Sequence, residues 1–147
     1  MKMKILLLNT VQGLKPMYDT DYDEKKKLKL GVVYTADIKI ARNYEFHKKY
    51  FALINCAFEY LTLDIREKLF RDSIEPFRKT LQIAAGYFEL VYSVERKEFV
   101  EQASSIAFDK MSESEFSELY EKVKFVLFKH FLGGISEEAF MKELANF

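Results

Sequence analysis

The alternation of apolar and polar residues gives way to a helical period at Asn43, and this change is the clearest structural signal in the chain. Residues 34–40, Tyr-Thr-Ala-Asp-Ile-Lys-Ile, alternate as a half-buried strand does, so we expect a strand over 32–40. Asn43 then stands at the expected N-cap of a helix over 44–61, and Glu45 suits the positive end of its dipole. A step of about 100° per residue gathers one apolar face, which consists of His47, Tyr50, Phe51, Ile54, Ala57, Phe58 and Leu61.

The opposite face of this predicted helix is polar, and two lysines lie near its start. It carries Glu45, Lys48, Ala52, Asn55 and Glu59, with Lys49 and Cys56 on its flank. Cys56 is therefore expected on the wetter side of the helix. No histidine stands next to it in the sequence, so the pattern does not indicate a nucleophile.

The front of the chain is predicted as a strand followed by a short helix. Met3–Leu8 forms the strand, and the chain turns at Gln12–Gly13. Thr20 caps a helix over 19–29, in which acidic residues come first and lysines last, as the helix dipole favours. Gly31 is the expected stop.

The second half is predicted as two helices, a hairpin and two more helices. One helix spans 64–72, and Ser73 caps the next, which tolerates Pro76 in its first turn and ends at Gly86. The hairpin strands are expected at 87–92 and 98–102 around a turn at 95–97, and the pattern allows a third strand at 104–108.

A capping box from Ser112 to Glu115 opens the longest helix of the second half. Its apolar stripe consists of Phe116, Leu119, Tyr120, Val123, Val126, Leu127 and Phe131. Gly133–Gly134 breaks it, and Ser136 caps a last helix that ends at Phe147. Because strands and helices do not alternate regularly, the sequence predicts an α+β fold with a small antiparallel sheet packed with several helices. We expect a single domain over residues 1–147.

Composition supports a folded protein that does not span a membrane. The chain has 147 residues, 49% of them hydrophobic, with 14 Phe and 9 Tyr, and only 5 Gly and 2 Pro. No apolar run approaches the roughly 20 residues that a bilayer requires, and Met1–Leu8 is too short for a secretory signal. The single cysteine excludes an internal disulfide and a multi-cysteine zinc site. We expect a cytoplasmic protein of a bacterial host cell.

Charge is balanced overall but divided along the chain. The formal net charge of 0 argues against a strongly basic nucleic-acid binder. Residues 1–79 hold 16 Lys and Arg against 11 Asp and Glu, whereas residues 80–147 hold 7 against 12. A basic front half suits a polyanion and an acidic back half repels one; simple solvation of helices explains the same charges.

Catalytic motifs are missing from the sequence. It contains no GxxxxGK[ST], GxGxxG or GxSxG motif. His47 and His130 stand far apart, and each has a structural explanation, at the edge of a core and at a helix C-terminus. Asp37 with Lys39 gives only a faint outline of a metal-dependent nuclease. We expect no cofactor, no bound metal and no enzymatic activity, with a small nuclease as the minor alternative.

Basic residues mixed with aromatic residues at two helix starts are the stronger functional signal. Helix starts present free amides and a positive dipole end, which attract phosphate, and single-stranded nucleic acid binds basic grooves with stacking rings. Most of the aromatic residues belong in a core, and Tyr44 is the best stacking candidate. The predicted nucleic-acid-binding residues are Arg42, Tyr44, Lys48, Lys49, Arg78 and Lys79, to which Arg96 and Lys97 at the hairpin tip add charge.

Five segments of the chain carry a resemblance to known sequences: Pro16-Met17-Tyr18-Asp19, the run from Ala41 to Leu53, Phe77-Arg78-Lys79, Ala84-Ala85-Gly86 and Ile135-Ser136-Glu137-Glu138. Through these segments, and over nearly its whole length, the chain resembles a family of phage and prophage proteins of unknown function.

The order of elements also resembles the NinB (Orf) recombination proteins of lambda-like phages. That resemblance places Lys48 and Lys49 at the family's basic step and Arg42 at its leading arginine. It implies binding of single-stranded DNA, usually as a homodimer, and loading of recombinase in place of the host single-strand-binding protein. The chain departs from that family in having no tryptophan, in His47 where an amide residue is usual, and in an extra segment at 10–30.

Two functions follow as hypotheses. The first is a phage- or prophage-derived protein that binds single-stranded DNA during recombination or replication. The alternative is a protein-interaction module of phage replication, whose acidic last helices around Glu113–Glu121 and Glu137–Glu138 dock on a basic partner.

Overall fold

The computed structural model describes residues 2–41 and 43–147. The chain divides into two compact units, residues 1–41 and residues 42–147, and each is described by itself. The described residues form six α-helices, a short 3-10 helix and two antiparallel sheets of two strands each. The fold class is therefore α+β, as predicted. Two compact units can belong to one domain, so the single domain stays a prediction.

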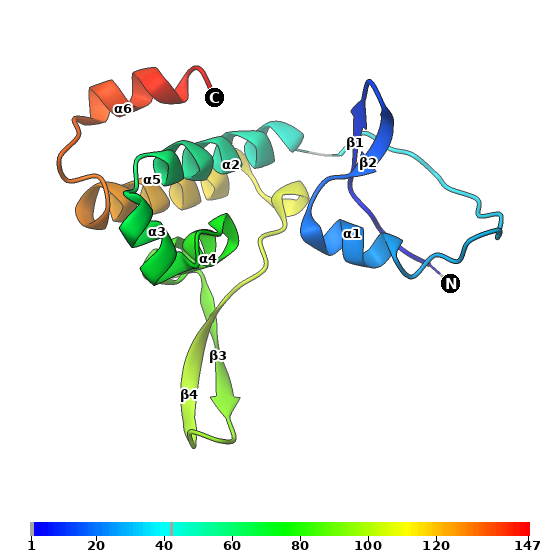
Figure 1. Ribbon diagram of the computed structural model, residues 1–147, viewed down its shortest axis with the longest axis horizontal. Helices are drawn as coiled ribbons and strands as arrows, with labels where there is room; N and C mark the ends of the chain where they lie inside the picture. Colours follow the sequence, from blue (N-terminus) through cyan, green and yellow to red (C-terminus); the bar gives the residue numbers. More distant parts are fainter. Residues whose placement is uncertain (1, 42) are drawn as a thin grey trace. The chain divides into compact units, whose positions relative to one another are not determined.

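In the first unit a small hairpin precedes one short helix (Figure 1). Strand β1 (Leu7–Thr10) pairs antiparallel with β2 (Gly13–Pro16). The predicted strand over Met3–Leu8 coincides with β1 only at Leu7 and Leu8, and the sequence did not predict β2. Helix α1 (Asp19–Lys25) is shorter than predicted, and Tyr18 rather than Thr20 is its N-cap residue.

Asp21 connects this helix to the hairpin. Its side chain is buried, and one carboxylate oxygen accepts a hydrogen bond from the Tyr18 amide at 3.1 Å while the other accepts one from the Leu6 amide at 3.0 Å. A single carboxylate thus satisfies one amide at the start of α1 and one just before β1.

The predicted strand over 32–40 is wrong. These residues have no regular secondary structure, and Val33 and Ile40 are almost fully exposed. Alternation gives a segment one apolar side, but a strand also needs a neighbouring backbone to accept its hydrogen bonds. In the described part of the chain β1 pairs only with β2, and no strand lies beside 32–40.

The second unit is built around three helices, α2 (Tyr44–Glu59), α4 (Ile74–Ala84) and α5 (Glu113–His130), which pack against one another (Figure 1). Helix α3 (Leu63–Phe70) packs on α4, and α6 (Glu137–Leu144) packs on α2. Phe46 of α2 stacks on Phe116 of α5 with ring centroids 4.5 Å apart. The fully buried side chains of this core include Tyr50, Leu53, Ile54, Cys56, Phe77, Leu81, Leu119, Val123, Leu127 and Phe140.

These helices confirm most of the predicted periodicity, with one correction. The stripe of α5 from Phe116 to Leu127 is buried. The Oγ atom of Ser112 accepts a hydrogen bond from the Glu115 amide, and that of Ser136 accepts one from the Ala139 amide, both at 3.1 Å. Cys56 was expected on the wetter side of α2 but is fully buried. Because α2 is covered on more than one side, by α4, α5 and α6, its buried arc is wider than a single apolar stripe.

Asn43 holds the predicted N-cap position but does not cap the helix with its side chain. Its backbone is left-handed, at φ 58°, and no side-chain capping bond forms. Instead Nδ2 donates to the carbonyl oxygens of Phe108 at 2.8 Å and Met111 at 2.9 Å. The side chain therefore ties the start of α2 to the short helix η1 (Phe108–Lys110).

Strands β3 (Phe88–Ser93) and β4 (Glu98–Ala103) form the predicted hairpin, with Phe88 opposite Ala103 and Ser93 opposite Glu98. The third strand that the pattern allows at 104–108 does not form. Ser104 donates the last bond of the ladder, to the Tyr87 carbonyl oxygen at 3.0 Å. The chain then turns into the core, where Phe108 is buried.

No helix in residues 2–41 or 43–147 is both long enough and apolar enough to cross a bilayer.

Candidate nucleic-acid interface

The first turns of α2 present two exposed lysines. Lys48 and Lys49 are exposed, as the polar face predicts, and Tyr44 is half-buried. Arg42, the leading arginine of the predicted site, lies outside the described residues. Because Asn43 directs its side chain to η1, the positive end of α2 carries no side-chain cap.

Lys49 also contacts a neighbouring helix. Its Nζ atom lies 4.7 Å from the ring centroid of Tyr120 on α5, which is within cation–π range. Tyr120 is buried, and burial raises the pKa of its hydroxyl. Lys49 therefore lies toward α5 and contributes to packing as well as to surface charge.

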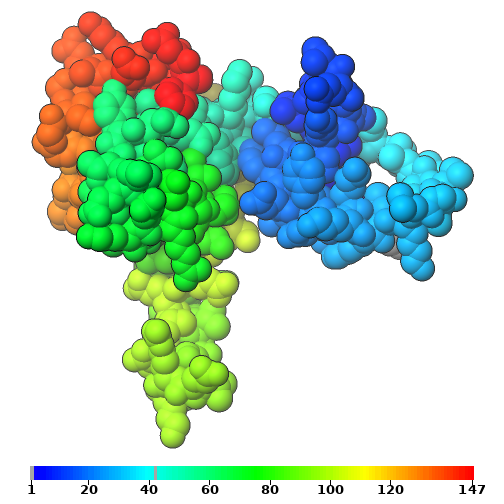
Figure 2. Space-filling model, in the orientation of Figure 1, coloured from blue at the N-terminus to red at the C-terminus, as the bar shows by residue number. Residues whose placement is uncertain are grey.

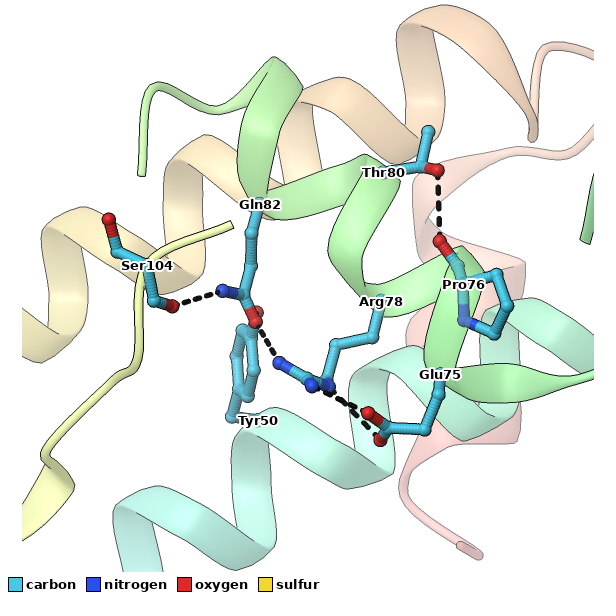
Figure 3. Close-up of polar contacts among 7 residues, drawn as sticks. All are labelled: Tyr50, Glu75, Pro76, Arg78, Thr80, Gln82 and Ser104. Atoms are coloured by element: carbon cyan, nitrogen blue, oxygen red, sulfur yellow. Dashed lines mark hydrogen bonds and ion pairs between the residues drawn. The ribbon is translucent and has the colours of Figure 1, made fainter. Parts of the chain in front are cut away.

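Arg78 is held in a polar network between α4 and α2 (Figure 3). Its Nε and Nη2 atoms donate to the two carboxylate oxygens of Glu75 at 3.2 and 2.7 Å. Its Nη1 atom donates to Oε1 of Gln82 at 2.5 Å. The arginine side chain is only 19% exposed, so most of its charge is compensated inside the protein.

Gln82 is the centre of this network and is fully buried. Its Oε1 atom also accepts from the Tyr50 hydroxyl at 3.1 Å, and its Nε2 atom donates to the Ser104 carbonyl oxygen at 3.0 Å (Figure 3). One amide side chain thus joins α2, α4 and the segment after β4. Burial of the Tyr50 hydroxyl raises its pKa.

The charge of Arg78 acts on two neighbouring groups. The hydrogen bond from Arg78 lowers the pKa of Glu75, although partial burial opposes this. The pKa of His47 is lowered to about 4, because burial penalises the charged imidazolium and the Arg78 charge repels it. The His47 ring packs between Phe51 and Phe108, with centroids 4.8 and 4.7 Å away. His47 is therefore neutral at physiological pH, and the prediction that it lies at the edge of the core is confirmed.

The predicted basic residues consequently lie toward different neighbours of α2. The Arg78 guanidinium lies 5.9 Å from the Phe51 ring centroid on the α4 side, whereas Lys49 lies over Tyr120 of α5. Lys48 is exposed, and Lys79, next to Arg78, is exposed as well. Whether these residues contact DNA stays a prediction.

Sequence reasoning missed the residues that hold Arg78. Glu75 stands three positions before it and Gln82 four positions after it, which is the spacing of neighbours on a helix face, so both were open to detection. The contact with Ser104 could not be detected in this way, because its carbonyl group belongs to a residue 22 positions after Gln82.

Asp37 and Lys39, the residues that suggested a metal-dependent nuclease, do not lie at the end of a strand. Both residues lie in the irregular segment 32–40. Within the described residues no group of three or more His, Cys, Asp or Glu side chains has an arrangement that would hold a metal ion.

A small pocket lies at the C-terminal end of α4. Its volume is about 300 Å³, and its lining consists of Ala85, Gly86, Tyr87, Met111, Glu115, Glu118 and Lys122. Lys122 donates to Glu118 at 2.7 Å and lies 5.7 Å from the Tyr87 ring centroid. The pocket therefore combines carboxylates, an aromatic ring and the negative end of a helix dipole.

Comparison with known proteins identifies a family but not an activity. No curated protein and no solved structure matches the chain. The sequence does match the family described as "Protein of unknown function (DUF1367)" over residues 3–65 and 66–143, which is nearly its full length. The chain belongs to the DUF1367 family.

Proposed function

We propose that this protein is phage- or prophage-derived and binds single-stranded DNA during recombination or replication, through the start of α2. The observation that carries the proposal is the pair Lys48 and Lys49, both exposed in the first turns of a helix without a side-chain cap. The positive dipole end and the two ammonium groups favour a phosphate at this place. The partners implied by the NinB resemblance, a host single-strand-binding protein or a recombinase, belong to the same proposal.

In this proposal the predicted residues have unequal parts. Arg78 is bonded to Glu75 and Gln82 and has little charge left for a phosphate. Lys48, Lys49 and Lys79 therefore supply the backbone contacts in this proposal. The half-buried Tyr44 supplies a ring face for one base.

Fluorescence anisotropy with labelled single-stranded and duplex oligonucleotides at two salt concentrations tests the proposal. For single strands, log K falls with log salt with a slope of about −0.7 per phosphate contacted, so two to three contacts predict a slope of roughly −2. Absence of binding at low salt would reject the proposal.

A double variant locates the site. Lys48→Glu with Lys49→Glu should weaken binding about tenfold or more at low salt, because two attractive contacts become repulsive. Lys129→Glu with Lys142→Glu, at two exposed positions late in α5 and α6, changes the net charge equally and should bind like wild type. Equal losses in both variants would mean that overall charge, and not α2, determines binding.

The pocket at the end of α4 favours a second candidate, a protein-interaction module. A Lys or Arg side chain of a basic partner fits between Glu115 and Glu118 and over the Tyr87 ring, where Lys122 now lies. A pull-down from host cells treated with nuclease should then recover a basic partner. The Glu115→Gln, Glu118→Gln variant should lose that partner, and recovery that disappears with nuclease alone would support DNA binding instead.

A further inference from the structure

The hairpin of β3 and β4 extends from the helices of the second unit (Figures 1 and 2), and one of its faces is apolar and exposed. Residues opposite each other in an antiparallel pair share a face. This face carries Phe88, Leu90, Tyr92, Phe99, Glu101 and Ala103. Leu90 is 61% exposed, Tyr92 51% and Phe99 66%. The Tyr92 and Phe99 rings contact each other edge to face, with centroids 5.4 Å apart, so this aromatic pair lies at the surface and not in the core.

Strand β4 directs one row of backbone groups away from β3. Ser104 donates to the Tyr87 carbonyl oxygen at 3.0 Å, so its amide points toward the β3 side. Inward and outward bonding alternates along an antiparallel strand. The amide and carbonyl groups of Phe99 and Glu101 therefore point outward, and in the described part of the chain no strand other than β3 pairs with β4. Such an edge is a template for a further strand.

The two strands carry carboxylates and no cation. Strand β3 contains Glu89, and β4 contains Glu98 and Glu101. The cations of the hairpin, Arg96 and Lys97, belong to its turn. A nucleic acid or a second copy of β4 would therefore meet like charge at this edge, whereas a strand with a positive side chain would meet the opposite charge.

We propose that this edge binds an extended segment of a basic partner protein, which adds to β4 in antiparallel order as a third strand. In this mode of recognition backbone bonds provide affinity and alternate side chains provide specificity. The residue opposite Glu101 shares its face and is Lys or Arg, and the residue opposite Phe99, two positions away, is apolar. A basic partner at this edge rests on the second candidate function, the protein-interaction module, and is independent of DNA binding at α2.

A titration followed by NMR tests the edge with a defined probe. The isotopically labelled full chain is titrated with the synthetic peptide acetyl-Thr-Val-Thr-Lys-Thr-Val-Thr-amide, whose pattern is the same in both directions. The peptide should shift the amide signals of Phe99 and Glu101 in a saturable manner and leave those of Lys48 and Lys49 unchanged. The same peptide with Glu in place of Lys should bind at least about tenfold more weakly, because a carboxylate then faces Glu101.

Methylation of single peptide amides tests the strand geometry. In antiparallel pairing the amide of the peptide Lys donates to the Glu101 carbonyl oxygen, whereas the amides of the two neighbouring Thr residues point away from β4. N-methylation of the Lys should therefore abolish the signal shifts. N-methylation of a neighbouring Thr is the matched control and should preserve them.

Two charge variants of the protein test the role of the carboxylate. Glu101→Lys should weaken peptide binding about tenfold or more, because the peptide cation then faces a cation. Glu67→Lys, at an exposed position of α3, changes the net charge equally and should bind like wild type. Circular dichroism should show the wild-type helix content in both variants.

Three results would overturn the proposal: no saturable shift with the Lys peptide, shifts in α2 instead of β4, or equal losses in Glu101→Lys and Glu67→Lys. The nuclease-treated pull-down is a separate test of the interaction module, since a basic partner held by Glu115 and Glu118 requires no added strand at β4. The failure of one of these two tests is therefore distinguishable from the failure of the other.

Discussion

Arg78 donates a hydrogen bond to the side-chain oxygen of Gln82, one turn further along α4, although the sequence suggests that this arginine faces a ligand. The same oxygen accepts from Tyr50, and the arginine also bonds both carboxylate oxygens of Glu75. The cation that the sequence pattern assigns to DNA thus has two hydrogen-bonded partners within the protein, Glu75 and Gln82. Its hydrogen bonds stay within α4, and its contact with α2 is the guanidinium 5.9 Å from the Phe51 ring centroid.

Replacement of Gln82 should be among the more destabilising polar substitutions in this protein. Gln82→Met keeps the volume but leaves the Ser104 carbonyl, the Tyr50 hydroxyl and one Arg78 nitrogen without their bonds. We expect the free energy of unfolding to fall by about 3 kcal/mol. Thr80→Ala, which removes an exposed hydroxyl on the same helix, should change it by only about 0.5 kcal/mol. Urea unfolding measures both, and equal losses would show that the network contributes little.

Stability should decrease in mildly acidic solution because of His47. An unfolded histidine takes up a proton near pH 6.5, whereas His47 in the folded protein does so near pH 4. Between these values the unfolded chain binds more protons, so the free energy of unfolding falls as pH is lowered from about 6.5 to about 4. Above pH 6.5 this group has no effect.

His47→Phe fills the place between Phe51 and Phe108 without a titrating group. The difference in stability between wild type and this variant should therefore depend on pH in the same window. His130→Gln, at the exposed end of α5, provides the matched control and should retain the wild-type pH dependence. A wild-type pH profile in His47→Phe would contradict the assignment.

The two lysines of α2 should differ in their effect on stability. Lys49→Gln removes a cation from the Tyr120 ring, which we expect to cost about 0.5–1 kcal/mol. Lys48→Gln changes an exposed side chain and should cost less than about 0.5 kcal/mol. Thermal unfolding of the two single variants measures the difference, and identical values would mean that the ring contact contributes nothing.

Cys56 should be unreactive in the folded protein. Its side chain is fully buried, and burial raises the pKa of the thiol, so little thiolate is present at neutral pH. A thiol reagent such as Ellman's reagent should react only as the protein unfolds, at a rate that increases with urea. Rapid reaction without urea would show that α2 opens locally.

Asp21 should be important for the first unit. Asp21→Asn replaces one of the two acceptor oxygens with a donor, so either the Leu6 or the Tyr18 amide loses its bond. We expect a cost of about 1–3 kcal/mol. Asp23→Asn weakens only an exposed ion pair with Lys26 at 3.7 Å and should cost less than about 0.5 kcal/mol. Hydrogen exchange of the α1 amides measures the two effects, and equal protection in both variants would contradict the role of Asp21.

The sequence by itself determined the features that depend on near neighbours in the chain. The helices from residue 44 onward lie where periodicity and capping residues predict them, and the side chains of Ser112 and Ser136 bond the expected amides. The hairpin of β3 and β4 also lies close to its predicted bounds. Each of these depends on contacts within a few residues, and the order of residue types specifies such contacts directly.

Tertiary structure alone decided how the same residues are used. Residues 32–40 alternate like a strand, but no other segment in the described part of the chain pairs with them. Asn43 has a capping side chain that bonds the carbonyls of Phe108 and Met111 instead. Cys56 is buried because helices cover α2 on several sides, and Arg78 is neutralised within a network that includes a carbonyl from beyond β4. These outcomes depend on which distant backbone and side-chain groups come within hydrogen-bonding distance, and a local pattern of apolar and polar residues does not specify that distance.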